Sequence, residues 1–241
     1  MSPDQIVLFD IPSKAPRAAW SLNPWKTRLL LSFKGLDYKT EWVDYPDIKP
    51  RLEPHVSFNP TTKTWTIPTV KFQDSTYLMD SRQIVNRIEE SHPEPSIHLD
   101  SPTLAKLEAI MPRLMTALRP IYFLSVPREL LTERGIEHWY ATRPALAGMP
   151  LDQLEKEFGG QKAWNAGQPI LHEIESLLGE NQDGPLFLGK TVSYADFVWV
   201  GFLLFMQRNG GIDELYKISG NPQLHKDILE ATAKYHKRND F

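Results

Sequence analysis

The sequence of 241 residues predicts a small α/β domain followed by an all-helical domain. Roughly the first ninety residues combine short apolar runs of strand type with two amphipathic helices. Residues 91–102 are rich in proline, serine and charge and show no periodicity, which is typical of a linker. Beyond them, apolar residues recur at spacings of three and four, as in packed helices. We therefore expect one domain over residues 1–92 and a second over residues 101–241.

The first strand and helix are predicted from local signals near the start of the chain. The run IVLFD at residues 6–10 is short, apolar and partly β-branched, which favours a buried strand. Ser21 and Asn23 are residue types that begin helices, and Pro24 suits an early helical position. Gly35 is the residue type that commonly ends one. A helix is expected between Ser21 and Gly35.

The remainder of the first domain is predicted to add three strands and one helix. Residues 38–43 alternate in polarity as a strand does, and a polar connection containing prolines is expected over residues 44–64. Two short strands, at 66–72 and 76–79, are separated by a turn and predict a hairpin. Residues 80–92 begin with capping types and predict a helix.

The second domain contains several amphipathic segments. One stripe has the spacing of a helix bundle or of a dimer seam, and Pro112 within it is expected to kink the helix. Its members are Leu104, Leu107, Met111, Leu114 and Leu118. Residues 151–158 and 169–179 also predict amphipathic helices.

A segment near the end of the chain predicts the central helix of this domain. Residues 193–211 are apolar nearly all round, which indicates burial on every side. Ser193 and Asp196 have the spacing of a capping box, so we assign them a structural role rather than a catalytic one.

Composition narrows the possible partners and location. The net charge is −3 and basic residues are spread along the chain, so no nucleic-acid or anionic membrane surface is expected. No signal peptide or membrane span is evident, and a cytoplasmic location is expected. Cysteine is absent and the seven histidines lack ligand spacing, so neither a disulfide nor a metal site is expected. A small molecule that supplies its own sulfur is compatible with these features.

Several motifs together resemble those of the cytosolic glutathione transferases. They are the stretch SLNPWKTRLLLSFKGLDYKTEWVDYPDI at residues 21–48, Ile67-Pro68, Asp80-Ser81, and Ser193 to Asp196. The first stretch is most similar to the fungal-specific class related to bacterial lignin β-etherases. The chain departs from that pattern at Leu22, where the family carries a proline directly after the serine.

The resemblance implies a fold, a co-substrate and an assembly. The first domain would be thioredoxin-like and bind glutathione, with no metal, and the helical-bundle second domain would contribute the acceptor-substrate pocket. A homodimer is implied, with the Leu104 to Leu118 stripe as its candidate seam.

Ser21 is the candidate catalytic residue. Taken alone, it is an ordinary helix-capping serine. The resemblance implies instead that its hydroxyl donates a hydrogen bond to the glutathione sulfur and favours the thiolate. The positive end of the following helix would act in the same direction, because helix N-termini lower thiol pKa values.

The resemblance also implies the other glutathione contacts. Asn23 belongs to the matching stretch. Pro68 would form a cis peptide bond, and the Ile67 backbone would contact the cysteinyl part of glutathione. Asp80 would meet the γ-glutamyl ammonium, and Ser81 with adjacent amides would bind the γ-glutamyl carboxylate; both residues are also ordinary helix-capping types.

Two further contacts have more than one candidate residue. The glycyl carboxylate would meet the long loop before the hairpin, where Lys49, Lys63 and His55 are the candidates. An acceptor pocket between the domains would be lined by Trp25, Tyr122 and Phe123.

The expected function is therefore conjugation of glutathione to apolar or aromatic electrophiles, with β-aryl-ether cleavage or peroxidase reactions as side activities. Two alternatives remain open. The same pocket would serve a ligandin-type carrier of hydrophobic aromatic compounds with little turnover, or the fold would belong to a non-catalytic interaction protein that fails to bind glutathione.

Overall fold

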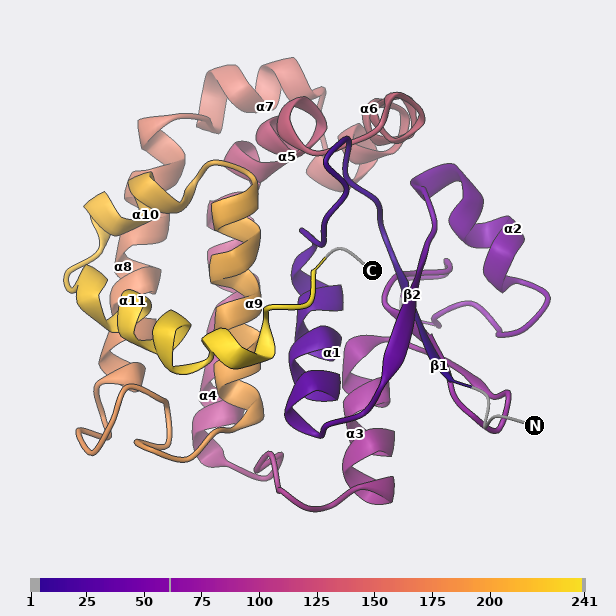
Figure 1. Ribbon diagram of the computed structural model, residues 1–241. Coiled ribbons are helices and arrows are strands. Elements are labelled where there is room, and N and C mark those ends of the chain that lie inside the picture. Colours follow the sequence, from indigo (N-terminus) through magenta and orange to yellow (C-terminus); the bar gives the residue numbers. More distant parts are fainter. Residues whose placement is uncertain (1–4, 61, 240–241) are drawn as a thin grey trace.

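A four-stranded mixed sheet forms the centre of the first domain in this computed structural model, which describes residues 5–60 and 62–239 (Figure 1). The strands are β1 (Ile6–Asp10), β2 (Tyr38–Trp42), β3 (Thr69–Lys71) and β4 (Tyr77–Met79). The sheet order is β2-β1-β3-β4, with β1 parallel to β2 and antiparallel to β3. β3 and β4 pair antiparallel, which confirms the predicted hairpin. The apolar strand β1 is buried throughout.

Three α-helices accompany the sheet: α1 (Leu22–Phe33), α2 (Ile48–Leu52) and α3 (Ser81–Ser91). α1 ends as predicted, because Gly35 adopts a positive φ of 65° just beyond it. The expectation of a plain connection over residues 44–64 is wrong in part. A 3-10 turn, Tyr45–Asp47, and α2 lie there, and α2 buries Ile48 and Leu52. Five residues that include a proline are too few for helical periodicity to show.

Eight α-helices follow residue 101 in the described chain. They are α4 (Pro102–Ala117), α5 (Arg119–Glu129), α6 (Glu133–Ala147), α7 (Leu151–Phe158), α8 (Gln161–Leu178), α9 (Tyr194–Arg208), α10 (Ile212–Ile218) and α11 (Pro222–Ala231). A last 3-10 turn spans Ala233–Tyr235. The helix predicted over residues 169–179 begins eight residues earlier, and Pro169 lies inside it.

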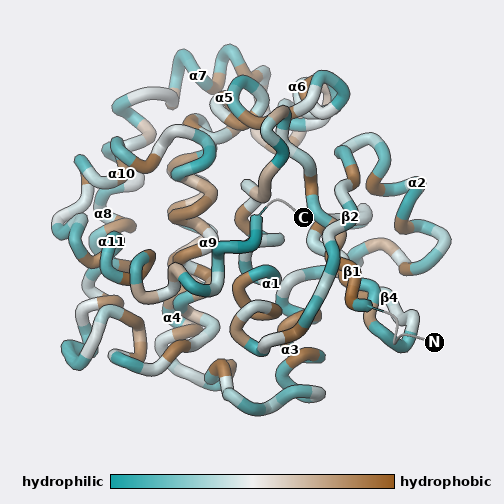
Figure 2. Tube along the Cα trace, viewed as in Figure 1, coloured by the Kyte–Doolittle hydropathy of each residue, from teal (hydrophilic) through white to brown (hydrophobic). Residues whose placement is uncertain are grey.

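α9 is the central helix, as its apolar sequence predicts. Every residue from Tyr194 to Met206 is buried, and α9 is largely brown in the hydropathy colouring of Figure 2. The capping box is confirmed: the Asp196 carboxylate accepts hydrogen bonds from the Ser193 amide at 2.7 Å and from the Phe187 amide at 2.9 Å. Burial raises the pKa of Asp196 to about 6, and these hydrogen bonds oppose the rise.

The apolar stripe of α4 belongs to the core of a single chain. Leu104, Leu107, Leu114 and Leu118 are at most 1% exposed and Met111 is 7% exposed. The bundle interpretation is therefore confirmed, and the expectation that this stripe forms a dimer seam is wrong, because its side chains are already covered by their own chain. α4 continues through Pro112 to Ala117, and the kink at Pro112 stays a prediction.

The two domains share one hydrophobic core, which runs from β1 to α11. α1 packs directly against α9 (Figure 1). Gly201 allows this approach, since a Cβ there would lie 3.2 Å from the Leu22 carbonyl oxygen. None of the helices in the described part of the chain combines the length and the hydropathy that a membrane span requires.

Candidate functional site

Ser21 stands at the N-cap of α1, yet its side chain does not cap the helix. Its backbone is extended, with φ −75° and ψ 133°, and its hydroxyl bonds to no described residue. An N-cap hydroxyl normally accepts from the amide at the second or third helical position. The third position is Pro24, which has no N–H. The hydroxyl is therefore available to another partner at the positive end of a twelve-residue helix.

A buried ion pair fixes α1 against the sheet. The Arg28 Nε donates to the Asp10 carboxylate at 2.8 Å, and both side chains are fully buried. Arg28 also donates to the Thr40 hydroxyl at 2.9 Å, which links α1 to β2. Burial raises the pKa of Asp10, and Arg28 opposes that rise. The ion pair therefore holds α1, which carries Ser21 at its N-cap, close to the end of β1.

The cis-proline segment lies beside the start of α3. The Ile67–Pro68 peptide bond is cis, as the resemblance predicts. The Pro68 carbonyl accepts from the Asp80 amide at 3.2 Å, so the predicted residues around Pro68 and Asp80 are adjacent. The amide and carbonyl of Ile67 bond to no other group in the described part of the chain. They remain open to a bound peptide.

Asp80 caps α3 with one carboxylate oxygen. Its Oδ1 accepts from the Arg82 amide at 2.8 Å and from the Gln83 amide at 3.3 Å, which confirms the capping interpretation. Its φ is +83°, a region that Asp and Asn enter more readily than most residues. Oδ2 has no hydrogen bond within the described chain. The cap therefore leaves one anionic oxygen for a ligand.

Ser81 opens α3 and connects the two domains. Its side chain lies close to the phenol of Tyr194 on α9. Burial of that phenol raises its pKa, so Tyr194 stays protonated. Ser81 and the first amides of α3 thus occupy the domain boundary.

Lys26 adds a positive charge that sequence reasoning missed. It lies partly buried on α1, and burial lowers its pKa while Glu108 of α4 and Asp80 oppose the change. Glu108 pairs in turn with Arg82 at 3.0 Å. This cluster of charges joins α1, α3 and α4. Its only sequence signal is the position of Lys26 four residues after Leu22, on the same helical face.

A cavity of about 280 Å³ lies between the domains next to this cluster. α1 contributes Leu22, Asn23 and Lys26 to its lining. The second domain contributes Glu108, Met111, Pro112, Met115 and Val198. Its wall is mainly apolar with a few polar groups, which is the usual character of a small-molecule pocket. The sequence prediction named Asn23 but neither methionine.

The three aromatic residues predicted for the acceptor pocket lie in two places. Trp25 is buried on α1, with its ring edge-on to His236 at 6.5 Å between ring centres. Tyr122 and Phe123 on α5 contact each other and pack with Phe205 and Trp139. Within the described chain, Trp25 makes no ring contact with either, and a shared acceptor role for the three stays a prediction.

Of the candidates for the glycyl carboxylate, only His55 lines a second hollow. Lys49 lies 5.3 Å from the centre of the Trp65 ring and 3.9 Å from the Glu53 carboxylate. His55 stacks on Tyr77 at 4.4 Å. A hollow of about 500 Å³ is lined by His55 and Trp65, among others. Lys63 is exposed on the same loop with a φ of +54°.

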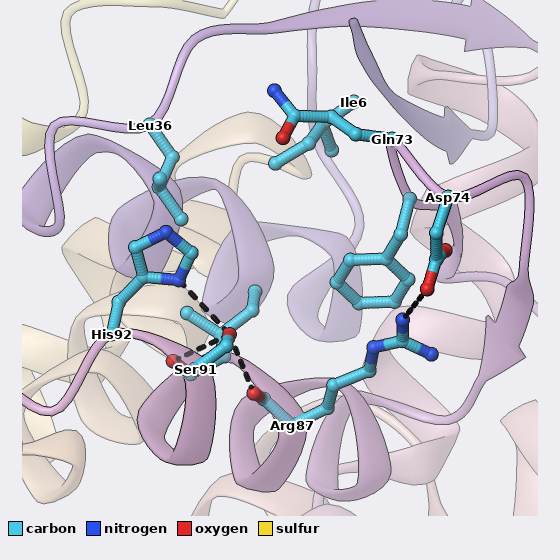
Figure 3. Close-up of a pocket in the computed structure, with 9 residues that line it drawn as sticks. Ile6, Leu36, Gln73, Asp74, Arg87, Ser91 and His92 are labelled. Atoms are coloured by element: carbon cyan, nitrogen blue, oxygen red, sulfur yellow. Dashed lines mark hydrogen bonds and ion pairs between the residues drawn. The ribbon is translucent and has the colours of Figure 1, made fainter. Parts of the chain in front are cut away.

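A further hollow, of about 190 Å³, lies at the opposite end of α3 (Figure 3). Arg87 there pairs with Asp74 and lies 4.1 Å from the centre of the Phe72 ring. The Ser91 hydroxyl lies 2.9 Å from the His92 ring. Because these polar groups are already paired and lie at the far end of the helix from Asp80, this hollow is separate from the candidate site. Across the described residues, no group of three or more His, Asp or Glu side chains is placed to hold a metal ion.

Comparisons with known proteins agree with this geometry. Residues 20–91 match the family model for the glutathione S-transferase N-terminal domain, and residues 105–235 match the C-terminal domain model. The chain is 32% identical over 220 residues to a glutathione S-transferase-like protein of Aspergillus flavus, covering 83% of this chain and 79% of that protein.

Two solved structures are similar over nearly the whole chain. One is a glutathione S-transferase of Ceriporiopsis subvermispora in complex with glutathione, at 28% identity and a TM-score of 0.82, covering 99% of this chain and 100% of that one. The other is the glutathione transferase GSTFuA3 of Phanerochaete chrysosporium, at 29% identity and a TM-score of 0.80, covering 98% and 99%. These matches confirm the predicted fold class, a thioredoxin-like domain followed by a helical domain.

Proposed function

Because the chain belongs to the glutathione S-transferase family, we propose that it binds reduced glutathione and transfers it to apolar or aromatic electrophiles, with Ser21 stabilising the thiolate. The single observation that carries the proposal is the Ser21 hydroxyl, which stands at a helix N-cap without serving as a cap. A hydroxyl in that position can donate to a sulfur.

The expected effect on the thiol follows from one charge-assisted hydrogen bond. Such a bond contributes about 1.5–3 kcal/mol, and a pKa unit corresponds to about 1.4 kcal/mol. A thiol with a pKa of about 8.5 in water would then have a pKa of about 6.5–7.5, before the helix N-terminus contributes. At the lower end of this range most of the bound glutathione would be thiolate at neutral pH, and the thiolate is the nucleophile.

The neighbouring residues support a tripeptide ligand that spans the first domain. The γ-glutamyl carboxylate would meet Ser81 and the first amides of α3, and the ammonium would meet Oδ2 of Asp80. The cysteinyl backbone would pair with the free amide and carbonyl of Ile67. Lys49 or Lys63 would meet the glycyl carboxylate from the long loop.

The cavity beside Asn23 and Lys26 would hold the acceptor. Its apolar wall, with Met111 and Met115, suits an uncharged carbon skeleton, since methionine adapts to differently shaped ligands. Holding the acceptor beside the thiolate would supply rate through proximity.

The test is an activity panel on the wild type and Ser21→Ala, with Ser32→Ala of the same helix as the control. The panel comprises 1-chloro-2,4-dinitrobenzene, an isothiocyanate, a β-aryl-ether ketone and a hydroperoxide. We expect Ser21→Ala to lower kcat/KM by about tenfold to a hundredfold, the change given by the loss of one hydrogen bond of about 1.4–2.8 kcal/mol. Activity of Ser21→Ala equal to that of Ser32→Ala would contradict the proposal.

A carrier function is the second candidate, and the adaptable methionine wall of the cavity is the observation that favours it. Tight binding of neutral aromatic compounds with no conjugation of any substrate in the panel would support this alternative. Failure of glutathione to bind in calorimetry would contradict the transferase proposal.

A homodimer in the cytoplasm is part of the same proposal. Family membership supports the homodimer, and the side chains of the α4 stripe are buried within their own chain and so are not available as its contact surface. Light scattering at micromolar concentration would test it.

A further inference from the structure

The 3-10 turn Tyr45–Asp47 of the first domain packs against α6 of the second domain. The same turn leads directly into α2, because Asp47 precedes Ile48, where α2 begins (Figure 1). α2 carries Lys49, one of the candidates for the glycyl carboxylate of glutathione. The contact with α6 therefore lies two residues from a proposed ligand contact.

Arg143 of α6 lies against two aromatic rings at this contact. Its guanidinium carbon is 4.9 Å from the centre of the Tyr45 ring and 4.2 Å from the centre of the Trp139 ring. The His138 ring stacks on Tyr45 with the ring centres 5.7 Å apart, and Trp139 meets Tyr45 edge-on. The attraction between a cation and a ring strengthens where water is excluded, and Trp139 is only 4% exposed. Arg143 therefore contacts one ring from each domain.

Polar contacts accompany the rings at both ends of the turn. Arg134 donates to the two carboxylate oxygens of Asp47, at 2.7 Å and 2.8 Å. The Asp44 carboxylate accepts from the hydroxyl of Thr132, which is the N-cap of α6. The residues on either side of the turn are thus bonded to the start of α6, in a planar paired geometry in the case of Arg134.

The far end of α2 is attached to the sheet instead. Arg51 pairs with Glu41 of β2 at 2.5 Å, and Leu52 is fully buried. Lys49 lies between these two attachments, and its side chain is 62% exposed. Its ammonium is 3.9 Å from the exposed Glu53 carboxylate, a pair that fixes its position only weakly. The placement of Lys49 over the sheet therefore depends on the attachment of the turn to α6.

We propose that α6 positions the glycyl end of the glutathione site, and that Arg143 is the positioning residue that holds the turn and, through it, Lys49. The inference rests on the proposed function, because it concerns the same bound tripeptide. When the turn is detached, α2 samples more positions, and the affinity falls in proportion to the fraction of molecules in which Lys49 is in place. Only a ligand with a charged glycyl end is sensitive to this fraction.

The test compares glutathione with its glycyl ethyl ester, which keeps the tripeptide and the thiol but has no glycyl carboxylate. Calorimetry measures the Kd of both ligands for the wild type, Arg143→Met and Arg113→Met. Arg113 is the matched control, since it is an exposed arginine of the second domain that pairs with Glu173. We expect Arg143→Met to bind glutathione about tenfold more weakly, which corresponds to about 1.4 kcal/mol, and the ester within about twofold of the wild type. Arg113→Met should match the wild type for both ligands.

A second variant covers the case in which Arg143→Met disturbs the fold of α6. The side chains of Arg134 and Asp47 are exposed, so Arg134→Met should fold normally while it weakens the attachment of the turn. We expect it to weaken glutathione by about twofold to fourfold, because exposed ion pairs contribute little, and to leave the affinity for the ester unchanged.

Three results would overturn the inference alone. They are an equal loss of affinity for glutathione and the ester in Arg143→Met, an unchanged affinity for glutathione in both variants, and a wild type that binds the ester as tightly as glutathione. A wild type that binds neither ligand would overturn the inference together with the proposed function.

Discussion

Pro24 limits how Ser21 can cap α1. At the third position of the helix it removes one of the two amides that a capping hydroxyl could bond, and the Ser21 hydroxyl has no partner in the described chain. The sequence contains both residues, yet serine is an ordinary capping type. Only the side-chain geometry separates the capping interpretation from the proposed catalytic one.

Asp80 provides a substitution that separates binding from catalysis. Asp80→Asn keeps an acceptor for the helix cap and tolerates a positive φ, but it removes the charge proposed to meet the γ-glutamyl ammonium. We expect the KM for glutathione to rise by about tenfold with kcat unchanged, because this contact is equal in ground and transition states.

The control for this experiment is Asp74→Asn, which removes an exposed carboxylate of the β3–β4 hairpin far from the site. Steady-state kinetics with glutathione varied would measure both variants. An unchanged KM in Asp80→Asn would show that the charge of Asp80 takes no part in the recognition of glutathione.

At the scale of elements, the site depends on how α1 and α3 meet the sheet. Sequence patterns predicted the strands, the hairpin and the starts of both helices, because capping residues and apolar periodicity act locally. They did not predict the Arg28–Asp10 pair, because a charged residue in an amphipathic helix usually faces solvent. The same limit applies to Lys26 and Glu108, which approach each other only when α1 packs against the second domain through α9.

Removal of Arg28 should weaken the attachment of α1 to the sheet. Arg28→Met leaves the Asp10 carboxylate buried without its counter-charge, so we expect the free energy of unfolding to fall by about 3–5 kcal/mol. Adding Asp10→Asn to it should recover part of the loss. Arg113→Met, which breaks the exposed pair with Glu173, should cost less than about 1 kcal/mol. Urea denaturation measures all three; equal losses in Arg28→Met and Arg113→Met would contradict the account.

Hydrogen bonds of Glu175, which link α8 to α11, should make the free energy of unfolding depend on pH in the acid range. Burial tends to raise the pKa of Glu175, but hydrogen bonds from His225, Ser219 and Gly220 outweigh it and lower the pKa. A carboxylate with a lowered folded pKa contributes stability above its unfolded pKa of about 4.5, which is lost as pH falls through the folded value.

Glu175→Gln should therefore lose stability less steeply than the wild type as pH falls below about 4.5. Glu137→Gln, an exposed residue of α6, is the control and should follow the wild type. Thermal unfolding followed by circular dichroism between pH 3 and pH 6 would show this. Parallel acid curves for the wild type and Glu175→Gln would contradict the assignment.

At the scale of the whole molecule, the order of strands and helices was predictable from the sequence. Whether an apolar stripe packs within one chain or between two chains was not. The stripe from Leu104 to Leu118 has the same spacing whether it packs inside a chain or between chains, so its sequence could not exclude a dimer seam. The interdomain cavity was equally hidden, because Met111 and Met115 approach Leu22 only after both domains have folded.

The shared core predicts cooperative unfolding. One cluster of buried side chains runs through both domains, and Gly201 brings α9 within close contact of α1. We expect a single transition, with tryptophan fluorescence and far-UV circular dichroism giving the same midpoint. Two separated transitions would show that the domains unfold independently.

The ionisation of bound glutathione tests the central claim most directly. Thiolate absorbance of the glutathione complex, titrated between pH 5 and pH 10, should give a thiol pKa about one to two units below that of free glutathione in the wild type and in Ser32→Ala. In Ser21→Ala the thiol should titrate close to the free value while glutathione still binds. A thiol pKa in Ser21→Ala equal to that of the wild type would contradict the role of Ser21.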